Sequence, residues 1–515
     1  MKHGKILPIV MVLMIMLAAC NGKTAKQPAN AVDIRLSDQT IQVDGKPVSS
    51  DPQSAVYAAH DIVYYESGKD FTYGEGSIDD SHTPEEAAAH TVLHITVPGV
   101  YRLSGKLSKG QIAVDLGKDA EEDPRAVVTL ILDGVDITCE VAPAVIFYQV
   151  YECGSKDNPS KDVDTSTAGA NIVIADDSEN QIHGAYVARI YKPDSVVLNE
   201  QGNAVEDAKK LHKYDGAFYS KMSMNVDGEK KNTGKLDIYA ENEGMDSEMH
   251  LTINGGNIHI DSGNDGINTN EDGVSVTTVN GGTLSIQVTG QTGEGDGIDS
   301  NGWLVINGGT VIAAACSDSA DAGIDSDMGI YINGGTVIAG GSMLDHIEEG
   351  GQTYAVFSFV QKQSGSNTVY LKNEKEKAVL EYCPQNAYSV LVYSSPELEE
   401  GTYTLWSDEQ QLAGQGSGFG GPGMGPGGMM PPGGQENDRQ PPQPPTGQEP
   451  PAGVPDGQKP PEGVAPSNRP DWPDGNNWDP NRSEENLETQ SLVFQISDGA
   501  NVFSGIGPAA QSDGQ

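Results

Sequence analysis

One short phrase recurs in the middle of the sequence and limits what this chain can fold into. Asparagine followed by two glycines occurs at intervals of 26, 27 and 26 residues, at Asn254, Asn280, Asn307 and Asn333. A second phrase, Gly-(Met/Ile)-(Asp/Asn)-(Ser/Thr), alternates with it and begins at Gly244, Gly266, Gly297 and Gly323. Self-similarity at such a period indicates a repeat architecture, in which each unit buries an apolar face only by stacking on its neighbours.

Each unit contains short β-branched runs interrupted by glycine, with no stretch long enough for an ordinary helix. Two or three short strands per unit predict a parallel β-helix, whose successive turns lie roughly 4.8 Å apart and bring equivalent residues into rows. We expect the four asparagines to form one row, pointing inward and bonded through their amides, with the paired glycines at positive φ. A binding role for these asparagines is the alternative.

The first residues have the features of a targeting segment. Lys2 and Lys5 precede an apolar run that ends near Leu17, and small residues lead to Cys20. This pattern predicts a lipoprotein signal peptide over residues 1–20, with Cys20 as the lipidated N-terminus; an ordinary secretory signal is the alternative. We expect an exported protein, held on the outer face of the bacterial cell membrane by its lipid only, since no later segment is long and apolar enough to span a membrane.

The charge of the chain excludes one class of partner. Lys and Arg number 31 against 74 Asp and Glu, which gives a formal net charge of −43. Such a polyanion repels nucleic acid, so we expect no DNA or RNA partner. The cysteines have no metal-ligand spacing; Cys139 and Cys153 form a disulfide or stay separate thiols, and the sequence leaves both open.

Changes in composition divide the chain. Of the 30 prolines, 17 lie between Pro422 and Pro480, where no core can form. Longer irregular insertions, at 152–168 and 186–212, are expected at the corners of the repeat, where binding surfaces are often built. The predicted fold class is all-β, with these parts: signal peptide 1–20, tether 21–32, N-terminal β cap 33–96, parallel β-helix 97–345, C-terminal β cap 346–413, disordered Pro/Gly-rich segment 414–488, and a terminal strand docking on the cap, 489–507.

Several phrases occur in an order that resembles a known family. They are Gly99-Val-Tyr-Arg-Leu-Ser-Gly, Ile112-Ala-Val-Asp, Leu130-Ile-Leu-Asp-Gly-Val-Asp-Ile-Thr, Ala142-Pro-Ala-Val-Ile and Asp215-Gly-Ala-Phe-Tyr-Ser-Lys. With the two repeated phrases, they resemble the clostridial carbohydrate-binding β-helix family, which includes a cellulose- and polygalacturonate-binding protein related in structure to pectate lyases. The likeness covers roughly residues 90–410. It implies a right-handed parallel β-helix, bound calcium, and polysaccharide binding without catalysis.

The distribution of charge in the repeats bears on catalysis. Between Gly244 and Gly341 there are 13 acidic residues, and no Lys or Arg occurs between Lys235 and Lys362. A pectate lyase needs a strong base and cations that hold the substrate, and the repeats offer no basic residue. Two carboxylates at glycosidase spacing arise in any acidic row. We therefore expect a protein that is not an enzyme, with a polysaccharide lyase or glycoside hydrolase as the less favoured alternatives; Lys209, Lys210, His212 and Lys213 are expected to be solvated loop residues.

The acidic residues recur at matching corner positions, so stacking would bring their charges close together. Like charges at that spacing are costly unless a cation lies between them or they face open water. Calcium takes six to eight oxygen ligands from Asp, Asn and turn carbonyls. Together with the resemblance, this predicts a calcium site formed by Asp246, Asp265, Asn268, Asp296, Asp299, Asp325 and Asp327. A solvated acidic edge is the alternative.

A bound cation with open coordination positions could bridge this polyanion to an acidic glycan. For neutral glycans, aromatic rings that stack on sugar faces are the usual device, and Trp303 and Tyr331 are the candidates. The sequence thus predicts a cell-surface lipoprotein that binds a polysaccharide, an acidic plant-type glycan such as polygalacturonate, with cellulose as a further candidate. A structural or adhesive surface protein is the rival, and the oligomeric state is left open.

Overall fold

The computed structural model describes residues 31–415 and 490–509, and the account below concerns these residues. The predicted signal peptide with Cys20, most of the tether and most of the Pro/Gly-rich segment lie outside them. Within the described residues the chain is mostly β, with one short α-helix, α1 (Pro84–Ala88).

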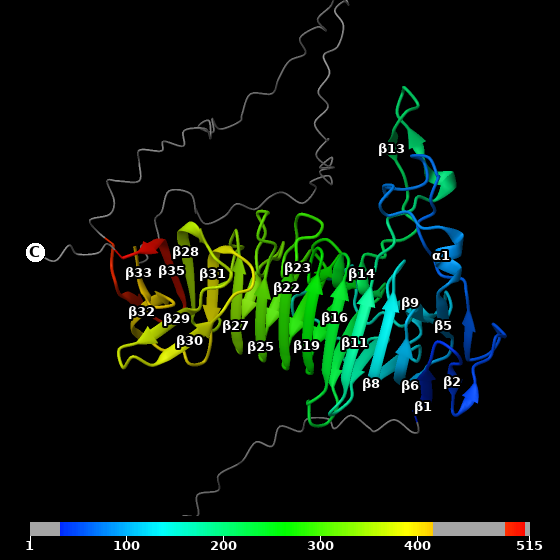
Figure 1. Ribbon diagram of the computed structural model, residues 1–515, viewed down its shortest axis with the longest axis horizontal. Helices are drawn as coiled ribbons and strands as arrows, with labels where there is room; N and C mark the ends of the chain where they lie inside the picture. The colour runs from blue at the N-terminus through cyan, green and yellow to red at the C-terminus, as the bar shows by residue number, and fades with distance from the viewer. Residues whose placement is uncertain (1–30, 416–489, 510–515) are drawn as a thin grey trace, which may run out of the picture.

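Parallel strands form three stacks that run along the length of the molecule (Figure 1). The first, here called the ladder stack, pairs successive strands in parallel. Its members are β6 (Gly99–Leu107), β8 (Val128–Cys139), β10 (Ala170–Ile174), β15 (Met224–Gly228), β18 (Leu251–Ile253), β21 (Val276–Val279), β24 (Trp303–Ile306) and β26 (Ile330–Ile332).

The second, the middle stack, continues from the end of β8. It consists of β11 (Glu179–Gly184), β16 (Lys235–Ala240), β19 (Asn257–Ser262), β22 (Thr283–Val288), β25 (Thr310–Ala314) and β27 (Thr336–Gly341). The third, the acidic stack, consists of β5 (Thr91–Ile95), β7 (Gly110–Asp115), β9 (Val145–Gln149), β14 (Gly216–Ser220), β17 (Glu243–Ser247), β20 (Ile267–Thr269) and β23 (Ile298–Ser300).

The core lies between the stacks, because alternate residues of each strand point inward. In β19, Ile258 and Ile260 are buried, and the register aligns them with Leu284 and Ile286 of β22. One cluster of buried apolar side chains extends through all three stacks. The sequence period therefore sets both which residues align and which of them are buried.

The predicted amide ladder is confirmed, but its predicted inward direction is wrong. Nδ2 of Asn280 donates to Oδ1 of Asn254 at 2.9 Å, and the same bond joins Asn307 to Asn280 at 2.9 Å and Asn333 to Asn307 at 2.8 Å. All four asparagines are exposed. Each follows a buried residue of the ladder stack, such as Ile253, and alternation along the strand turns it outward.

The glycines after each asparagine are required by the close approach of successive repeats. Gly282 has φ of 81°, and a Cβ there would lie 2.5 Å from the carbonyl oxygen of Gly256 in the preceding repeat. Only glycine adopts this backbone conformation without strain and leaves room for the neighbouring turn.

Both ends of the stacks are covered by further strands. At the N-terminal end lie β1 (Val32–Leu36), β2 (Gln42–Val43), β3 (Lys46–Pro47) and β4 (Val56–Ala59). At the other end, β31 (Tyr388–Ser394) pairs antiparallel with β27, in a second core with β28 (Tyr354–Gln363), β29 (Val369–Asn373), β30 (Ala378–Tyr382), β32 (Gly401–Ser407) and β33 (Gln410–Gln415). After the segment that is not described, β34 (Phe494–Ile496) pairs with β32, and β35 (Ala500–Pro508) pairs with β28 and β33.

Two insertions shape the surface. Residues 60–82 and 186–213 form a projecting lobe, which contains β12 (Val197–Leu198) and β13 (Val205–Asp207) and stands beside the N-terminal half of the stacks (Figure 1). Its two segments are joined by the bridge between Gly74 and Ile190 and by a 2.8 Å bond from the Tyr191 N–H to the Tyr73 carbonyl. Residues 151–168, here called the strap, lie against the outer side of the ladder stack, where Thr165 Oγ1 donates to Thr252 Oγ1 at 2.7 Å.

Candidate functional site

The acidic stack brings four of the predicted ligands into one outward-facing row. The register aligns Asp246 of β17 with Asn268 of β20, and Asn268 with Asp299 of β23. The next repeat follows without a named strand, because the Asp325 N–H donates to the Ile298 carbonyl at 2.7 Å. The row therefore runs Asp246, Asn268, Asp299, Asp325.

A second row lies three residues earlier in each repeat and is bonded to the first. Asn268 Nδ2 donates to Glu243 Oε1 at 3.1 Å and is 3.4 Å from Asp265 Oδ2. The N–H of Asp296 donates to Asp265 Oδ1 at 2.7 Å, and that of Ala322 to Asp296 Oδ1 at 2.6 Å. The two rows together, Glu243, Asp265 and Asp296 beside Asp246, Asn268, Asp299 and Asp325, are called the acidic rows below.

Three oxygen atoms of the acidic rows are buried without a hydrogen-bond partner. They are Oε2 of Glu243, Oδ2 of Asp246 and Oδ1 of Asn268, whose residues are 6%, 0% and 8% exposed. Leaving a buried polar atom unpaired costs roughly 1–3 kcal/mol, and more for a charged group. Three such oxygens in adjacent strands form an arrangement that a bound cation would satisfy.

Burial also changes the protonation of the row. Burial, followed by neighbouring carboxylates, raises the pKa of Asp296 to about 9, of Asp325 to about 7 and of Asp299 to about 6. The pKa of Asp246 and that of Asp265 are raised well above the usual value, first by burial and then by Glu243. The raised pKa values mean that, without a counter-ion, the site favours the protonated forms of these groups; a cation would favour their charged forms.

The far end of the rows opens toward solvent. Asp327 is exposed, and its N–H bonds to the Ser300 carbonyl at 3.0 Å, two residues beyond the Asp325 position. Asp345, which the sequence analysis did not single out, reaches the same place: its Oδ2 accepts from the Ser326 N–H at 3.1 Å. Asp345 follows the last repeat and lies outside both repeated phrases, so the sequence period could not identify it as a candidate ligand.

The near end of the rows is covered by the projecting lobe. Arg189 of the lobe lies 3.7 Å from Asp215 Oδ2 and 3.6 Å from Glu75 Oε2, and Lys210 lies 3.3 Å from Glu75 Oε1. Burial raises the pKa of Asp215, Asp246 and Glu248, and the nearby ammonium of Lys213 offsets part of that rise. Of the four residues that we expected to be solvated, Lys209 is exposed, whereas Lys213 acts on Asp246 of the acidic rows and Lys210 lies against Glu75. The expectation is wrong for His212, which is buried with its ring 3.9 Å from that of Tyr214.

The carboxylates are close but do not form a finished metal centre. In residues 31–415 and 490–509, no group of three His, Cys, Asp or Glu side chains converges on a point that could hold a metal ion. Calcium also accepts amide and backbone carbonyl oxygens, and Asn268 lies at the centre of the rows. A cation there would be held by one or two carboxylates together with such neutral oxygens.

The two predicted sugar-stacking residues lie on a different sheet. Trp303 and Tyr331 belong to β24 and β26 of the ladder stack, where both are half-buried. The ammonium of Lys161, from the strap, lies 5.0 Å from the centre of the Tyr331 ring. The structure thus brings Tyr331 together with the strap, and neither aromatic residue together with the acidic rows.

The described cysteines form no disulfide bond. Cys139, Cys153, Cys316 and Cys383 are all free thiols, which settles the open alternative for Cys139 and Cys153. In the part of the chain that is described, no helix has the length and apolar character to cross a membrane.

Comparison with known proteins identifies the family. The model of the carbohydrate-binding domain-containing protein family matches residues 89–353, slightly more than half of the chain. The chain belongs to this family, as the sequence resemblance predicts, and the matched residues include the acidic rows.

One curated protein and one solved structure are similar to parts of this chain. A carbohydrate-binding domain-containing protein of Acetivibrio thermocellus is 30% identical over 170 residues, which are 33% of this chain and 44% of that protein. The chain thus matches less than half of that relative's length. A solved structure of a polysaccharide lyase-like protein from C. thermocellum, a gadolinium derivative, aligns at 19% identity with a TM-score of 0.33, over 60% of this chain and 94% of that one.

Proposed function

We propose that this protein binds an acidic polysaccharide, such as polygalacturonate, through calcium held by the acidic rows. The observation that carries the proposal is the set of unpartnered buried oxygens on Glu243, Asp246 and Asn268, within the residues matched to the carbohydrate-binding family. A cation completes the coordination of these oxygens, and its open positions bind the carboxylates of the glycan.

Two positions along the rows suit such a cation. At the buried end, one or two of the carboxylates of Glu243, Asp246 and Asp265 would hold it together with the amide oxygen of Asn268. At the open end, one or two of the carboxylates of Asp296, Asp299, Asp325, Asp327 and Asp345 would hold a second one, together with backbone carbonyl oxygens. Calcium supplies positive charge, without which a protein of net charge −43 repels a polyuronate. The chain's own residues hold the cation in line and exclude water at the buried end.

The scaffold that we propose for this site is a right-handed parallel β-helix. The three parallel stacks, in registers that follow the sequence repeat, support it. In such a fold the acidic rows run parallel to the long axis, so that a linear polysaccharide lying along them meets several equivalent positions.

We propose binding without catalysis. In the repeats no Lys or Arg accompanies the acidic rows, and at their buried end Arg189 is paired with Asp215 and Glu75. One observation favours a second candidate, a polysaccharide lyase: the side chain of Lys213 acts on Asp215, Asp246 and Glu248, so this described residue is a candidate for the base that takes a proton from a uronate. A structural or adhesive role is the remaining rival.

The place of action that we propose is the cell surface. A lipid on Cys20 would hold the exported protein to the outer face of the membrane, and the following polar residues would act as a tether.

Retention of the protein in gels that contain soluble polygalacturonate tests the proposed function. We expect retention in calcium, loss of retention in EDTA, and recovery when calcium is restored. Equal mobility in all three conditions, with polygalacturonate and with every other glycan in the gel, would favour the structural role.

A further inference from the structure

A second surface, far from the acidic rows in the topology, has the chemistry of a sugar site. A shallow hollow of about 260 Å³ opens on the outer side of the first strands. Its polar lining comes from β1, β2, β6 and the turn in β8: Asp33, Arg35, Gln42, Arg102, Ser104 and Asp133. None of these residues belongs to the acidic stack.

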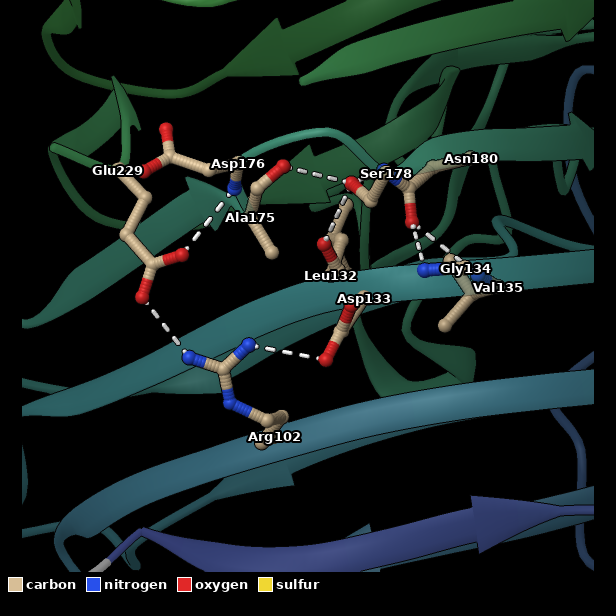
Figure 2. Close-up of polar contacts among 10 residues, drawn as sticks. All are labelled: Arg102, Leu132, Asp133, Gly134, Val135, Ala175, Asp176, Ser178, Asn180 and Glu229. Atoms are coloured by element: carbon tan, nitrogen blue, oxygen red, sulfur yellow. Dashed lines mark hydrogen bonds and ion pairs between the residues drawn. The ribbon is translucent and has the colours of Figure 1, made fainter. Parts of the chain in front are cut away.

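Arg102, which lines this hollow, is held in place by two carboxylates (Figure 2). Its two terminal nitrogens donate to Asp133 Oδ2 and to Glu229 Oε1, each at 2.9 Å, and Glu229 Oε2 accepts from the Asp176 N–H at 3.1 Å. These bonds connect β6, β8 and the segments that follow β10 and β15. Arginine has five N–H donors, so Arg102 keeps donors for a ligand in an orientation that is already set.

Four other lining side chains are free to bind a ligand. Among the described residues, the side chains of Asp33, Arg35, Gln42 and Ser104 form no hydrogen bond or ion pair with the protein. They include a carboxylate acceptor, a guanidinium donor, and an amide and a hydroxyl that do both. Neighbouring sugar hydroxyls, each both donor and acceptor, need this mixture.

The charge balance favours a neutral ligand. The lining has two guanidinium groups, of Arg35 and Arg102, and two carboxylates, of Asp33 and Asp133, so its formal charges cancel. A hollow without net charge gives no net attraction to a uronate carboxylate, whereas the hydroxyls of a neutral hexose or pentose can use both its donors and its acceptors.

The hollow lies at one end of a line that continues along the ladder stack. The register places Arg102 beside Ile131, Ile131 beside Val173, and Val173 beside Asp227. Asp227 bonds to Asn254, the first member of the exposed amide ladder. The ladder repeats at the strand spacing of roughly 4.8 Å, a length similar to one sugar ring of an extended polysaccharide. A linear glycan is the ligand class that fits a hollow continued by such a ladder.

We propose that this hollow is a metal-independent subsite for a neutral polysaccharide, which binds a sugar unit through Arg35, Gln42, Arg102 and Asp133. The inference rests on the proposed function as a polysaccharide-binding protein and adds a second class of glycan to it. Asp33, Arg35 and Gln42 precede residue 89, where the match to the family begins, so half of the polar lining lies outside the matched residues.

Binding of cellohexaose and xylohexaose in EDTA, measured by titration calorimetry on the exported chain, tests this proposal. The variant is Arg35→Ala with Gln42→Ala, and the matched control is Lys46→Ala, which removes an exposed charge of the same cap outside the hollow. We expect the wild type and the control to bind at least one of the two probes. The affinity of the double variant for that probe should be lower by roughly tenfold or more. Binding of oligogalacturonate in calcium should be equal in all three proteins.

Equal affinity of the double variant and the wild type would overturn the proposal, as would the absence of binding of both neutral probes by the wild type. A further outcome would count against the calcium-dependent function of the acidic rows and leave the hollow unaffected. If oligogalacturonate fails to bind in calcium while a neutral probe binds in EDTA and requires Arg35, the hollow stands and the calcium-dependent function does not.

Discussion

Asp246 is the most deeply buried of the predicted ligands. It is fully buried, its Oδ2 has no partner, and its Oδ1 accepts from Asn270. Its neighbours across the register are Tyr219 and Asn268, which supply no positive charge. The calcium affinity of the proposed site should therefore depend on the charge of the Asp246 carboxylate.

Replacing Asp246 by Asn keeps the shape and removes the charge. We expect calcium affinity to fall about tenfold or more, which corresponds to about 1.4 kcal/mol or more. The Tm in EDTA should change little, because burial already favours the uncharged form of Asp246. Calcium titration followed by calorimetry checks both. The control is Asp237→Asn on the middle stack, where the side chain lies between the buried Leu236 and Ile238 and faces outward; an Asp246 variant that titrates like this control would remove Asp246 from the site.

His212 makes the acid side of the stability profile testable. Burial lowers the pKa of His212 to about 4, and neither ring nitrogen has a hydrogen-bond partner. Because the folded-state pKa is below the unfolded value of about 6.5, stability is present above that value and is lost as the pH falls toward 4, by up to about 3 kcal/mol. His212→Phe, which retains an aromatic ring against Tyr214, should lose less stability over this range.

Urea unfolding in EDTA at both ends of that pH range measures the difference. The same acid-side loss in the wild type and in His212→Phe would show that His212 does not contribute to it.

The sequence could predict which residues form the outer row, because the period that aligns Asp246, Asn268, Asp299 and Asp325 is visible in their repeated phrase. It could not predict the roles of Asp215, Arg189 or Asp345. These residues belong to an insertion, or lie outside the repeated phrases, and reach the rows through contacts between segments distant in sequence. Periodicity carries no information about such contacts.

At the scale of elements, the exposed amide ladder offers a graded test of the repeat. Asn280 both donates to Asn254 and accepts from Asn307, whereas Asn333 takes part in one ladder bond. At about 0.5–1.5 kcal/mol for each bond, Asn280→Ala should cost about 1–3 kcal/mol of unfolding free energy and Asn333→Ala about half as much. Urea denaturation of both variants measures the ratio. Equal costs would mean that the ladder bonds do not stabilise the fold.

The strap and the lobe show why the insertions were the least predictable elements. Their positions in the sequence show that they interrupt the repeat. They do not show which surfaces these segments cover. Lys161 of the strap reaches Tyr331, 170 residues later, and Arg189 of the lobe reaches Glu75, 114 residues earlier. The predicted aromatic platform is therefore partly covered, which the residues around Tyr331 gave no reason to expect.

At the scale of the whole molecule, the acidic rows make stability depend on pH and calcium together. The pKa values of Asp299, Asp325 and Asp296 are raised to about 6, 7 and 9, above the unfolded value of 3.8. In the metal-free protein, their contribution to stability is fully present below that unfolded value and is lost as the pH rises through about 6 to 9.

We therefore expect the Tm in EDTA to fall as the pH rises across this range, and calcium to raise the Tm most at its alkaline end. Scanning calorimetry at several pH values, with EDTA or with calcium, checks this. Magnesium, which prefers a rigid octahedral site, provides the control and should raise the Tm less. A calcium effect independent of pH would contradict the assignment of these carboxylates as ligands.

The central claim is that the acidic rows bind an acidic glycan through calcium, and titration calorimetry with oligogalacturonate tests it most directly. The protein without residues 1–20, the predicted signal peptide, is titrated in calcium and then in EDTA, while the ultraviolet absorbance of unsaturated uronates is followed in parallel. We expect heat of binding in calcium only, and no rise in absorbance. A rise in absorbance would mean a lyase, and the absence of heat in both conditions would contradict the proposed site.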